Sequence, residues 1–223
     1  MSNFADLDDE LWSDVVNKIQ IDENATFLEF GVASGNTMCA LLNNLVKKGI
    51  RPRAVIGFDA FEGLPEEDAS VAKHESWVKG AFNLKDEITN NDKIETKPSE
   101  IIDPITILVD RFKYYHKYDI DIRLIKGWYS ELDSSLDINP ACFIHIDCDL
   151  YISSMYALNW LAVHKLFGPN CLVRYDDWNI PDIECYTSGE SLAHKEICEK
   201  YNLEFDFVDK NGHAAVLYRY KEK

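Results

Sequence analysis

Short runs of buried-type strand residues alternate along this chain with helical patterns, and this alternation limits the fold more than any other feature. The runs are TFLEFGV (26–32), AVIGFDA (54–60), IRLIKG (122–127), CFIHID (142–147) and CLVRYD (171–176). Apolar strands separated by helices are typical of a parallel sheet covered on both faces. The runs FDFVD and AAVLYRY flank an Asn-Gly turn and predict an antiparallel hairpin. We therefore expect an α/β fold: a doubly wound, Rossmann-like, mostly parallel sheet of about seven strands with a C-terminal antiparallel hairpin and helices on both faces.

One connection is much longer than a crossover needs. A single domain over residues 1–223 is expected from the length, and its leading helix is predicted at 6–20 by apolar residues at four-residue spacing. About sixty residues separate the second and third strands, where one helix and two loops would suffice. Residues 103–118 supply that helix. Residues 62–98 are charged and aperiodic, and we expect them to form a lid-like insertion over the site, with a disordered excursion as the alternative.

Charge and cysteine usage narrow the class of protein. The formal net charge of −16 disfavours nucleic acid and anionic membranes, whose phosphates require Lys and Arg. The six cysteines include no CxxC pair, which indicates reduced, packed thiols rather than disulfides or a zinc site. The acidic N-terminus resembles neither a signal peptide nor a membrane span. We expect a cytoplasmic protein.

The first two strands end in residues suited to a nucleoside-bearing cofactor. Ligands of doubly wound sheets bind at the carboxyl ends of the strands. After the first strand, Gly31 and Gly35 of EFGVASGNT permit a tight turn before a helix whose first amides are free. Asp59, at the end of the second strand, is suited to accept hydrogen bonds from ribose hydroxyls. The glycine turn alone fits ordinary strand-to-helix packing equally well, and the acid favours a cofactor.

Aspartates end the fourth and fifth strands. IHIDCDLY places Asp147 after the fourth, and YDDW places Asp176 and Asp177 after the fifth. Carboxylates converging at one sheet edge need a partner, and oxygen-only ligation suits Mg²⁺. As the alternative, Asp149 or Ser153 caps the following helix and Asp177 faces solvent.

Five blocks of the sequence resemble a known family. EFGVASGNT, FDAFEGLPE, KGWYSE, HIDCDLYISSMYAL and YDDW, in this order, are similar to the signature blocks of the macrocin O-methyltransferase (TylF-type) family of class I S-adenosylmethionine-dependent methyltransferases. The resemblance covers about residues 27–200. It implies Mg²⁺-dependent transfer of a methyl group from S-adenosylmethionine to a hydroxyl of a sugar or glycosylated small molecule. Trp178 stands where this family is expected to have tyrosine.

The resemblance also implies roles for individual residues. Glu29, Gly31 and Gly35 would line the methionine part of the cofactor. Asp59 would bind the ribose, and Phe61, Trp128 and Tyr129 would flank adenine. Asp147, Asp176 and Asp177 would ligate the metal, and Asp147 would also be catalytic. The implied cofactor site consists of Glu29, Gly31, Val32, Ala33, Ser34, Gly35, Asn36, Thr37, Asp59, Ala60, Phe61, Gly127, Trp128, Tyr129 and Asp147.

The general base and the exact reaction have alternatives. A metal-bound hydroxyl has a lowered pKa, and a base helps remove its proton. His74, on the insertion, is the first candidate, with an ordinary surface histidine as the alternative. His145 shares a strand face with Asp147 but lies one step deeper, as a residue that packs or supports a ligand from behind. A metal-independent methyltransferase, a dinucleotide oxidoreductase and a non-catalytic cofactor-binding module stay open, as do the acceptor and a homo-oligomeric state.

Overall fold

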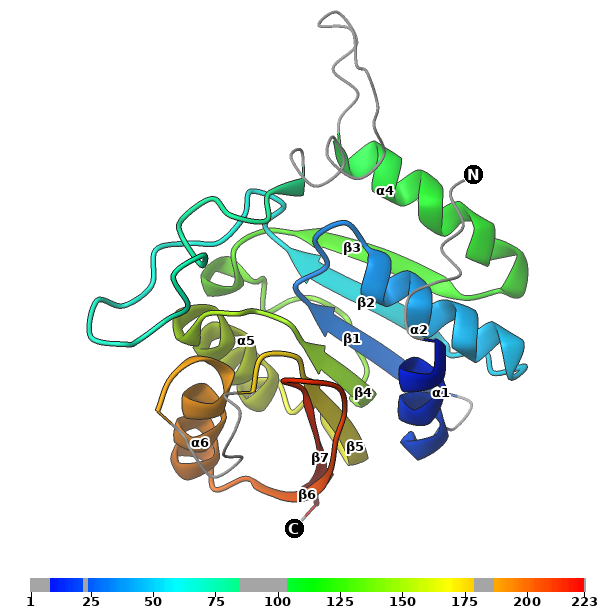
Figure 1. Cartoon of the computed structure of the whole chain (residues 1–223). Helices are drawn as coiled ribbons and strands as arrows, with labels where there is room; N and C mark the ends of the chain where they lie inside the picture. Colours follow the sequence, from blue (N-terminus) through cyan, green and yellow to red (C-terminus); the bar gives the residue numbers. More distant parts are fainter. Residues whose placement is uncertain (1–8, 22–23, 85–103, 179–186, 223) are drawn as a thin grey trace, which may run out of the picture.

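The computed structural model describes residues 9–21, 24–84, 104–178 and 187–222 (Figure 1). The chain begins with α1 (Asp9–Lys18), β1 (Thr26–Phe30), α2 (Asn36–Lys47) and β2 (Ala54–Asp59). The long connection then carries α4 (Pro104–Phe112) and the 3-10 helix η2 (Lys113–Tyr118). The remaining elements are β3 (Asp121–Lys126), the 3-10 helix η3 (Tyr129–Glu131), β4 (Ala141–Ile146), α5 (Tyr151–Val163), β5 (Phe167–Tyr175), α6 (Gly189–Tyr201), β6 (Glu204–Lys210) and β7 (Val216–Lys221).

The strands form one seven-stranded sheet in the order β3-β2-β1-β4-β5-β7-β6. The first five strands pair in parallel, and β7 runs antiparallel to both β5 and β6. The predicted doubly wound sheet with a terminal hairpin is confirmed. The strand order reverses between the neighbours β1 and β4, which is where ligands of such sheets bind.

Helices cover both faces of the sheet, with α1, α2 and α4 on one side and α5 and α6 on the other (Figure 1). Alternate residues of each strand therefore enter two different cores. Phe27 of β1 packs in the cluster with Leu41 of α2, whereas its neighbour Leu28 packs in the cluster with Leu158 of α5. Because both faces are covered, all five residues of β1 are buried, as expected for a central parallel strand.

The predicted crossover helix is found as α4 and η2, and the leading helix as α1; residues 6–8 lie outside the described part. Of the predicted insertion, residues 62–83 contain no helix or strand, and residues 85–98 are not among those described. Two backbone hydrogen bonds join the ends of the loop between Leu64 and Ala81. The Leu64 carbonyl oxygen accepts from the Gly80 amide, and the Leu64 amide donates to Ala81 O, each at 2.9 Å.

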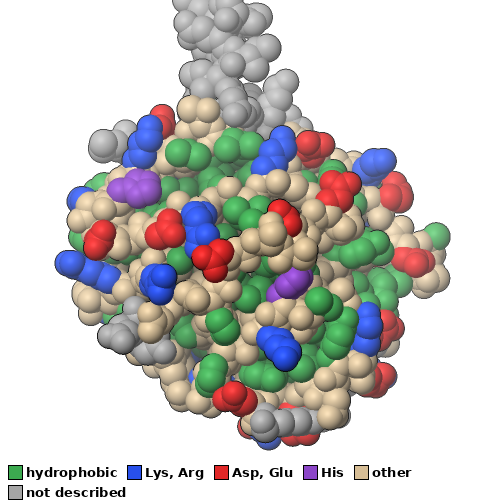
Figure 2. Space-filling view, turned by 180° about the vertical axis from the view of Figure 1, so that it is seen from behind, with side chains coloured by type: hydrophobic (Ala, Val, Ile, Leu, Met, Phe, Trp, Pro, Cys, Tyr) green, Lys and Arg blue, Asp and Glu red, His purple; other side chains and the backbone are tan. Residues whose placement is uncertain are grey.

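The described residues show how the charges and the cysteines are arranged. On the face shown in Figure 2, the Lys and Arg side chains among the described residues are interspersed with Asp and Glu and form no basic patch. The five cysteines in the described segments are free thiols, and Cys185 lies outside those segments. None of the described helices is both long enough and apolar enough to span a bilayer.

Candidate active site

The turn after β1 brings two strand ends into close contact. Gly31 has φ +96°, and its amide donates to Phe58 O of β2 at 3.0 Å. A Cβ atom on Gly31 would lie 1.7 Å from the carbonyl oxygen of Asp147. Only glycine allows both this backbone conformation and this approach. The glycine turn is therefore a structural requirement for placing Asp147 beside the end of β1.

Asp59 connects the loops that follow β1 and β2. Its Oδ2 accepts from the Ala33 amide at 2.8 Å, and its Oδ1 accepts from the Phe61 amide at 2.5 Å. Both amides belong to residues with positive φ, so the carboxylate fixes two strained turns. Burial raises the pKa of Asp59, although the two hydrogen bonds act to lower it. Each carboxylate oxygen keeps a second lone pair for a ligand.

These loops enclose a cavity of about 370 Å³ at the carboxyl ends of the strands. Its walls combine the turn after β1, the insertion, the start of α5 and the acidic ends of β4 and β5. The lining residues are Gly31, Ala33, Asp59, Ala60, Gly63, Leu64, Pro65, Phe82, Gly127, Trp128, Tyr129, Ser130, Asp147, Cys148, Asp149, Ile152, Ser153, Tyr156, Asp176 and Asp177.

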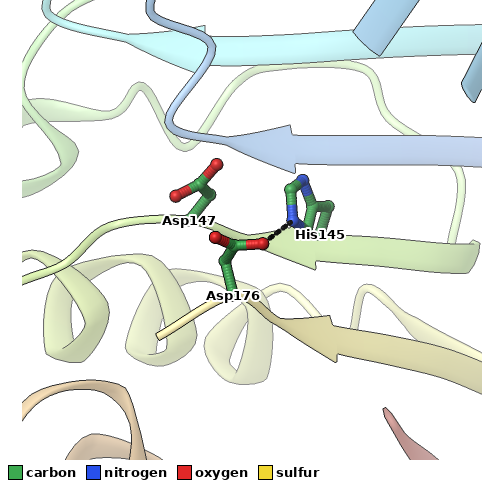
Figure 3. A group of neighbouring side chains, drawn as sticks. All are labelled: His145, Asp147 and Asp176. Carbon is green, nitrogen blue, oxygen red and sulfur yellow. Dashed lines mark ion pairs between the residues drawn. The ribbon is translucent and has the colours of Figure 1, made fainter. Parts of the chain in front are cut away.

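Asp147 and Asp176 lie side by side at this edge (Figure 3). Together with His145, each offers one ligand atom, and these atoms lie within 4.8 Å of one another. The Asp176 amide donates to Ile146 O at 2.9 Å and so continues the pairing of β5 with β4. Among the described residues no group donates a hydrogen bond to the Asp147 carboxylate. Burial, followed by the charge of Asp176, raises the pKa of Asp147 to about 8.

A buried arginine supplies the positive charge next to Asp176. Arg174 Nη1 donates to Asp176 Oδ1 and, at 2.7 Å, to His145 Nε2. A ring nitrogen that accepts this bond is unprotonated, so His145 carries its proton on Nδ1 while the contact holds. Although burial opposes it, the Arg174 guanidinium holds the pKa of Asp176 well below its usual range. Arg174 is itself fixed by Asn211 at 2.8 Å and lies over the Trp12 ring of α1.

Glu29 is a buried carboxylate with no hydrogen-bond partner among the described residues. It is 2% exposed, and its Oε1 lies 3.9 Å from His145 Nδ1. Burial raises its pKa. Glu29 does not line the cavity, so its predicted contact with the methionine part of a cofactor stays a prediction.

Asp149 and Asp177 form a second carboxyl pair in the cavity wall. Burial together with the charge of Asp177 raises the pKa of Asp149 to about 9. Asp177 is not part of the group formed by His145, Asp147 and Asp176, so its role as a metal ligand stays a prediction.

Neither Asp149 nor Ser153 caps α5 in the described structure. Leu150 occupies the N-cap position and makes no side-chain cap. Glu67 of the insertion accepts from the amides of Tyr151 and Ile152 instead, at 2.7 and 3.1 Å. Asp149 and Ser153 line the cavity.

Several predicted residues lie away from the cavity wall. His74 is exposed, and its Nδ1 pairs with Ser76 Oγ at 2.6 Å. Phe61 and Val32 are buried in the core between the sheet and α2. Trp178 is fully buried against Tyr175, with ring centroids 5.0 Å apart, and so has a packing role. The predicted cofactor residues that do not line the cavity are Glu29, Val32, Ser34, Gly35, Asn36, Thr37 and Phe61.

Three residues near the acids were missed by sequence reasoning. Arg174 had a readable signal, since a basic residue inside an apolar strand run is expensive unless it has a partner. Glu67 and Glu190 had none. Glu190, in the first turn of α6, is fully buried, and it accepts from the amides of Cys148 and Asp177 at 2.9 and 3.0 Å.

Comparison with known proteins identifies the family. The sequence profile described as macrocin O-methyltransferase (TylF) matches residues 9–188. The chain belongs to this family. It is therefore an O-methyltransferase, as the resemblance of its sequence blocks implied.

Solved structures of methyltransferases share the fold. The O-methyltransferase NovP superposes with a TM-score of 0.62 at 18% identity, over 96% of this chain and 78% of NovP. The calicheamicin methyltransferase CalS11 gives 0.65 at 16% identity, over 96% and 77%. An apo structure of CalS11, described as a TDP-rhamnose 3'-O-methyltransferase, gives 0.58 at 14% identity, over 97% and 80%. A search of curated protein sequences finds no match.

Proposed function

We propose that this enzyme transfers a methyl group from S-adenosylmethionine to a hydroxyl of a sugar or glycosylated small molecule, with Mg²⁺ bound at the acidic edge of the cavity. The observation that carries the proposal is that one cavity holds both the ribose-type acid Asp59 and the paired carboxylates of Asp147 and Asp176. A methyl donor and a chelated acceptor would need these two sites side by side.

The cofactor end of the cavity fits a nucleoside. Asp59 presents unused lone pairs to ribose hydroxyls, and Gly31 and Ala33 bring backbone close to the ligand. Trp128 and Tyr129 line the same wall and would flank the adenine. Tyr129 is held in place by a hydrogen bond from its hydroxyl to Phe58 O at 3.2 Å. The cofactor supplies an activated methyl group on sulfur.

The acidic end fits a hard divalent cation. The Asp147 carboxylate has no hydrogen-bond donor among the described residues, and Asp176 has one oxygen held by Arg174 and a second one available. Asp147, Asp176 and Asp177 would hold the ion through oxygen atoms, as Mg²⁺ prefers. When bound, the cation lowers the pKa of a chelated hydroxyl.

A base for the acceptor proton is available within the cavity wall. Asp149 lines the cavity between the end of β4 and α5, and an ionised carboxylate within reach of the reacting hydroxyl can take its proton. His74 is the other candidate and would have to approach from the exposed part of the insertion. We infer that Asp149 is the better placed of the two.

The cavity favours an acceptor without negative charge. Its described lining includes five aspartates and no Lys or Arg, and the segment 85–103 that follows the described insertion contains three lysines and six acids. A nucleoside diphosphate such as the one in TDP-rhamnose, on which CalS11 acts, would be repelled here unless cations neutralise it. We infer that the sugar is carried by an uncharged group.

The test is an acceptor screen with methyl-labelled S-adenosylmethionine, run with Mg²⁺ and with a chelator. We expect labelled product from neutral glycosides with a vicinal diol, lost on chelation and restored by added Mg²⁺. Undiminished transfer after chelation would favour the metal-independent methyltransferase.

A further inference from the structure

We propose that Glu190 is a positioning residue that fixes the backbone of the two acid-bearing loops after β4 and β5, with Glu67 as a second hold on the first loop. This inference rests on the proposed function for its effect on metal binding, but the contacts that carry it belong to the chain itself. Glu190 lies beyond the segment that matches the family profile, residues 9–188.

Glu190 reaches both loops with one carboxylate. Its Oε1 accepts from the Cys148 amide at 2.9 Å, next to Asp147 and Asp149. Its Oε2 accepts from the Asp177 amide at 3.0 Å, next to Asp176. The side chain is fully buried, where a backbone amide left without an acceptor is costly. The two carboxylate oxygens therefore fix the separation of the two loops.

Glu67 holds the other end of the first loop. The amides of Tyr151 and Ile152 begin α5 and have no partner within the helix. Glu67 is 7% exposed, and its two carboxylate oxygens accept hydrogen bonds from these two amides at 2.7 and 3.1 Å. A carboxylate at this position is also favoured by the helix dipole. The loop is thus held by a glutamate on each side.

The held loop needs such support because its backbone is strained. Asp149 has φ 58°, a conformation that residues other than glycine rarely adopt. Gly189, next to Glu190, has no side chain where one would crowd the Asp149 carbonyl, since a Cβ there would lie 3.3 Å from that oxygen. Strained conformations persist when surrounding contacts over-determine them. The two glutamates supply those contacts before any ligand binds.

Substitutions at Glu190 separate positioning from charge. In E190Q the amide side chain has one acceptor, so only one of the two backbone amides stays satisfied. In E190D the charge is kept, but the side chain is one methylene too short to reach both amides. If Glu190 acts through position, both variants lose metal affinity; if it acts only as a nearby negative charge, E190D binds metal like the wild type.

The readout is the binding of Mn²⁺ alone, measured from the electron paramagnetic resonance signal of the free ion. We expect the dissociation constant to rise at least tenfold in E190Q and in E190D, with S-adenosylmethionine affinity within about threefold of the wild type. Glu196→Gln is the matched control, because Glu196 lies on the same helix and, within the described part of the chain, accepts from the Tyr151 hydroxyl, at 2.7 Å, and from neither loop amide. Its Mn²⁺ affinity should not change. Wild-type affinity in either Glu190 variant overturns the proposal.

Hydrogen exchange of the metal-free protein tests the same contacts without relying on metal binding. We expect the Cys148 and Asp177 amides of the wild type to exchange slowly, and E67Q to accelerate exchange at Tyr151 and Ile152 but not at Asp177. Rapid exchange of Cys148 and Asp177 in the wild type overturns the proposal, even where the Glu190 variants fail to fold. Slow exchange with no Mn²⁺ binding by the wild type would instead remove the metal from the proposed function and leave the positioning contacts standing.

Discussion

Arg174 and Asp176 form an ion pair two residues apart at the end of β5, and the same guanidinium nitrogen also donates to His145 Nε2 at 2.7 Å. Arg174 is 5% exposed, so its charge has little access to water. The pair explains how an acidic strand end is tolerated before a cation binds. It leaves one oxygen of Asp176 and the whole carboxylate of Asp147 available to a ligand.

Replacing Arg174 by Met should destabilise the protein. Breaking a fully buried pair costs roughly 3–5 kcal/mol, but the Asp176 side chain is 39% exposed. We therefore expect a loss of about 2 kcal/mol in the free energy of unfolding, measured by urea titration. In the double variant R174M/D176N the loss should be smaller than the sum of the two single losses. Strict additivity would show that the contact is energetically silent.

Asp59→Ala should weaken S-adenosylmethionine binding by about 1–3 kcal/mol, the scale of lost hydrogen bonds to a charged group. Asp59→Asn should also weaken binding, because the neutral side chain no longer offers two acceptor oxygens to Ala33, Phe61 and the ribose. Calorimetry measures both. Glu62→Gln, which changes a nearby exposed acid paired with Lys126 at 3.5 Å, is the control and should bind normally. Unchanged affinity in both Asp59 variants would remove the ribose assignment.

Alanine at Asp147, Asp176 or Asp177 should abolish methyl transfer and leave cofactor affinity within a few-fold, because the cation would serve the acceptor. Asn at Asp177 should keep partial activity, since its carbonyl oxygen still ligates a hard ion. Mg²⁺ should raise the melting temperature of the wild type but not of the alanine variants. A melting temperature that rises equally in all four proteins would contradict a site built from these residues.

Gly31→Ala should lower the free energy of unfolding or displace Asp147 from the end of β1, because a methyl group would lie 1.7 Å from the Asp147 carbonyl oxygen. Gly49→Ala is a matched control: Gly49 also has positive φ, +70°, but a Cβ there meets nothing within 4 Å. The control should cost only about 1–2 kcal/mol of backbone strain. Thermal and urea unfolding compare the two. Equal losses would mean that the close approach of β1 and β4 carries no energetic weight.

His194 should make stability depend on pH. Burial lowers the pKa of His194 to about 3, against 6.5 in an unfolded chain. As the pH falls, the unfolded chain therefore takes up a proton on His194 before the folded protein does. The free energy of unfolding is unaffected by His194 above about pH 6.5. It falls between about pH 6.5 and 3, by up to about 1.4 kcal/mol per pH unit.

The matched variant is His194→Gln, which can still accept from the Tyr175 hydroxyl that bonds His194 Nδ1 at 2.8 Å. Urea unfolding of both proteins between pH 7 and 5 gives the difference in slope. We expect the wild type to lose more stability than the variant on acidification. Parallel curves would mean that His194 is not kept neutral in the folded protein.

The sequence by itself determined the sheet and the place of the site. Strand runs, the glycine turn, Asp59 and the aspartates after β4 and β5 were readable because hydrophobic patterning and turn chemistry are local, and because parallel strands end at one edge. The family was readable for the same reason, since its blocks are contiguous in the chain.

Only the tertiary structure decided what surrounds the acids. The contact of Glu67 with Tyr151 joins residues 84 positions apart, and that of Glu190 with Cys148 joins residues 42 apart. No local pattern marks a glutamate that will accept distant backbone amides, and none showed that Phe61 would turn into the core while Asp149 lined the cavity. These placements follow from packing between segments that meet only when the sheet is complete, because a buried amide or charge takes whichever partner the assembled fold brings within reach.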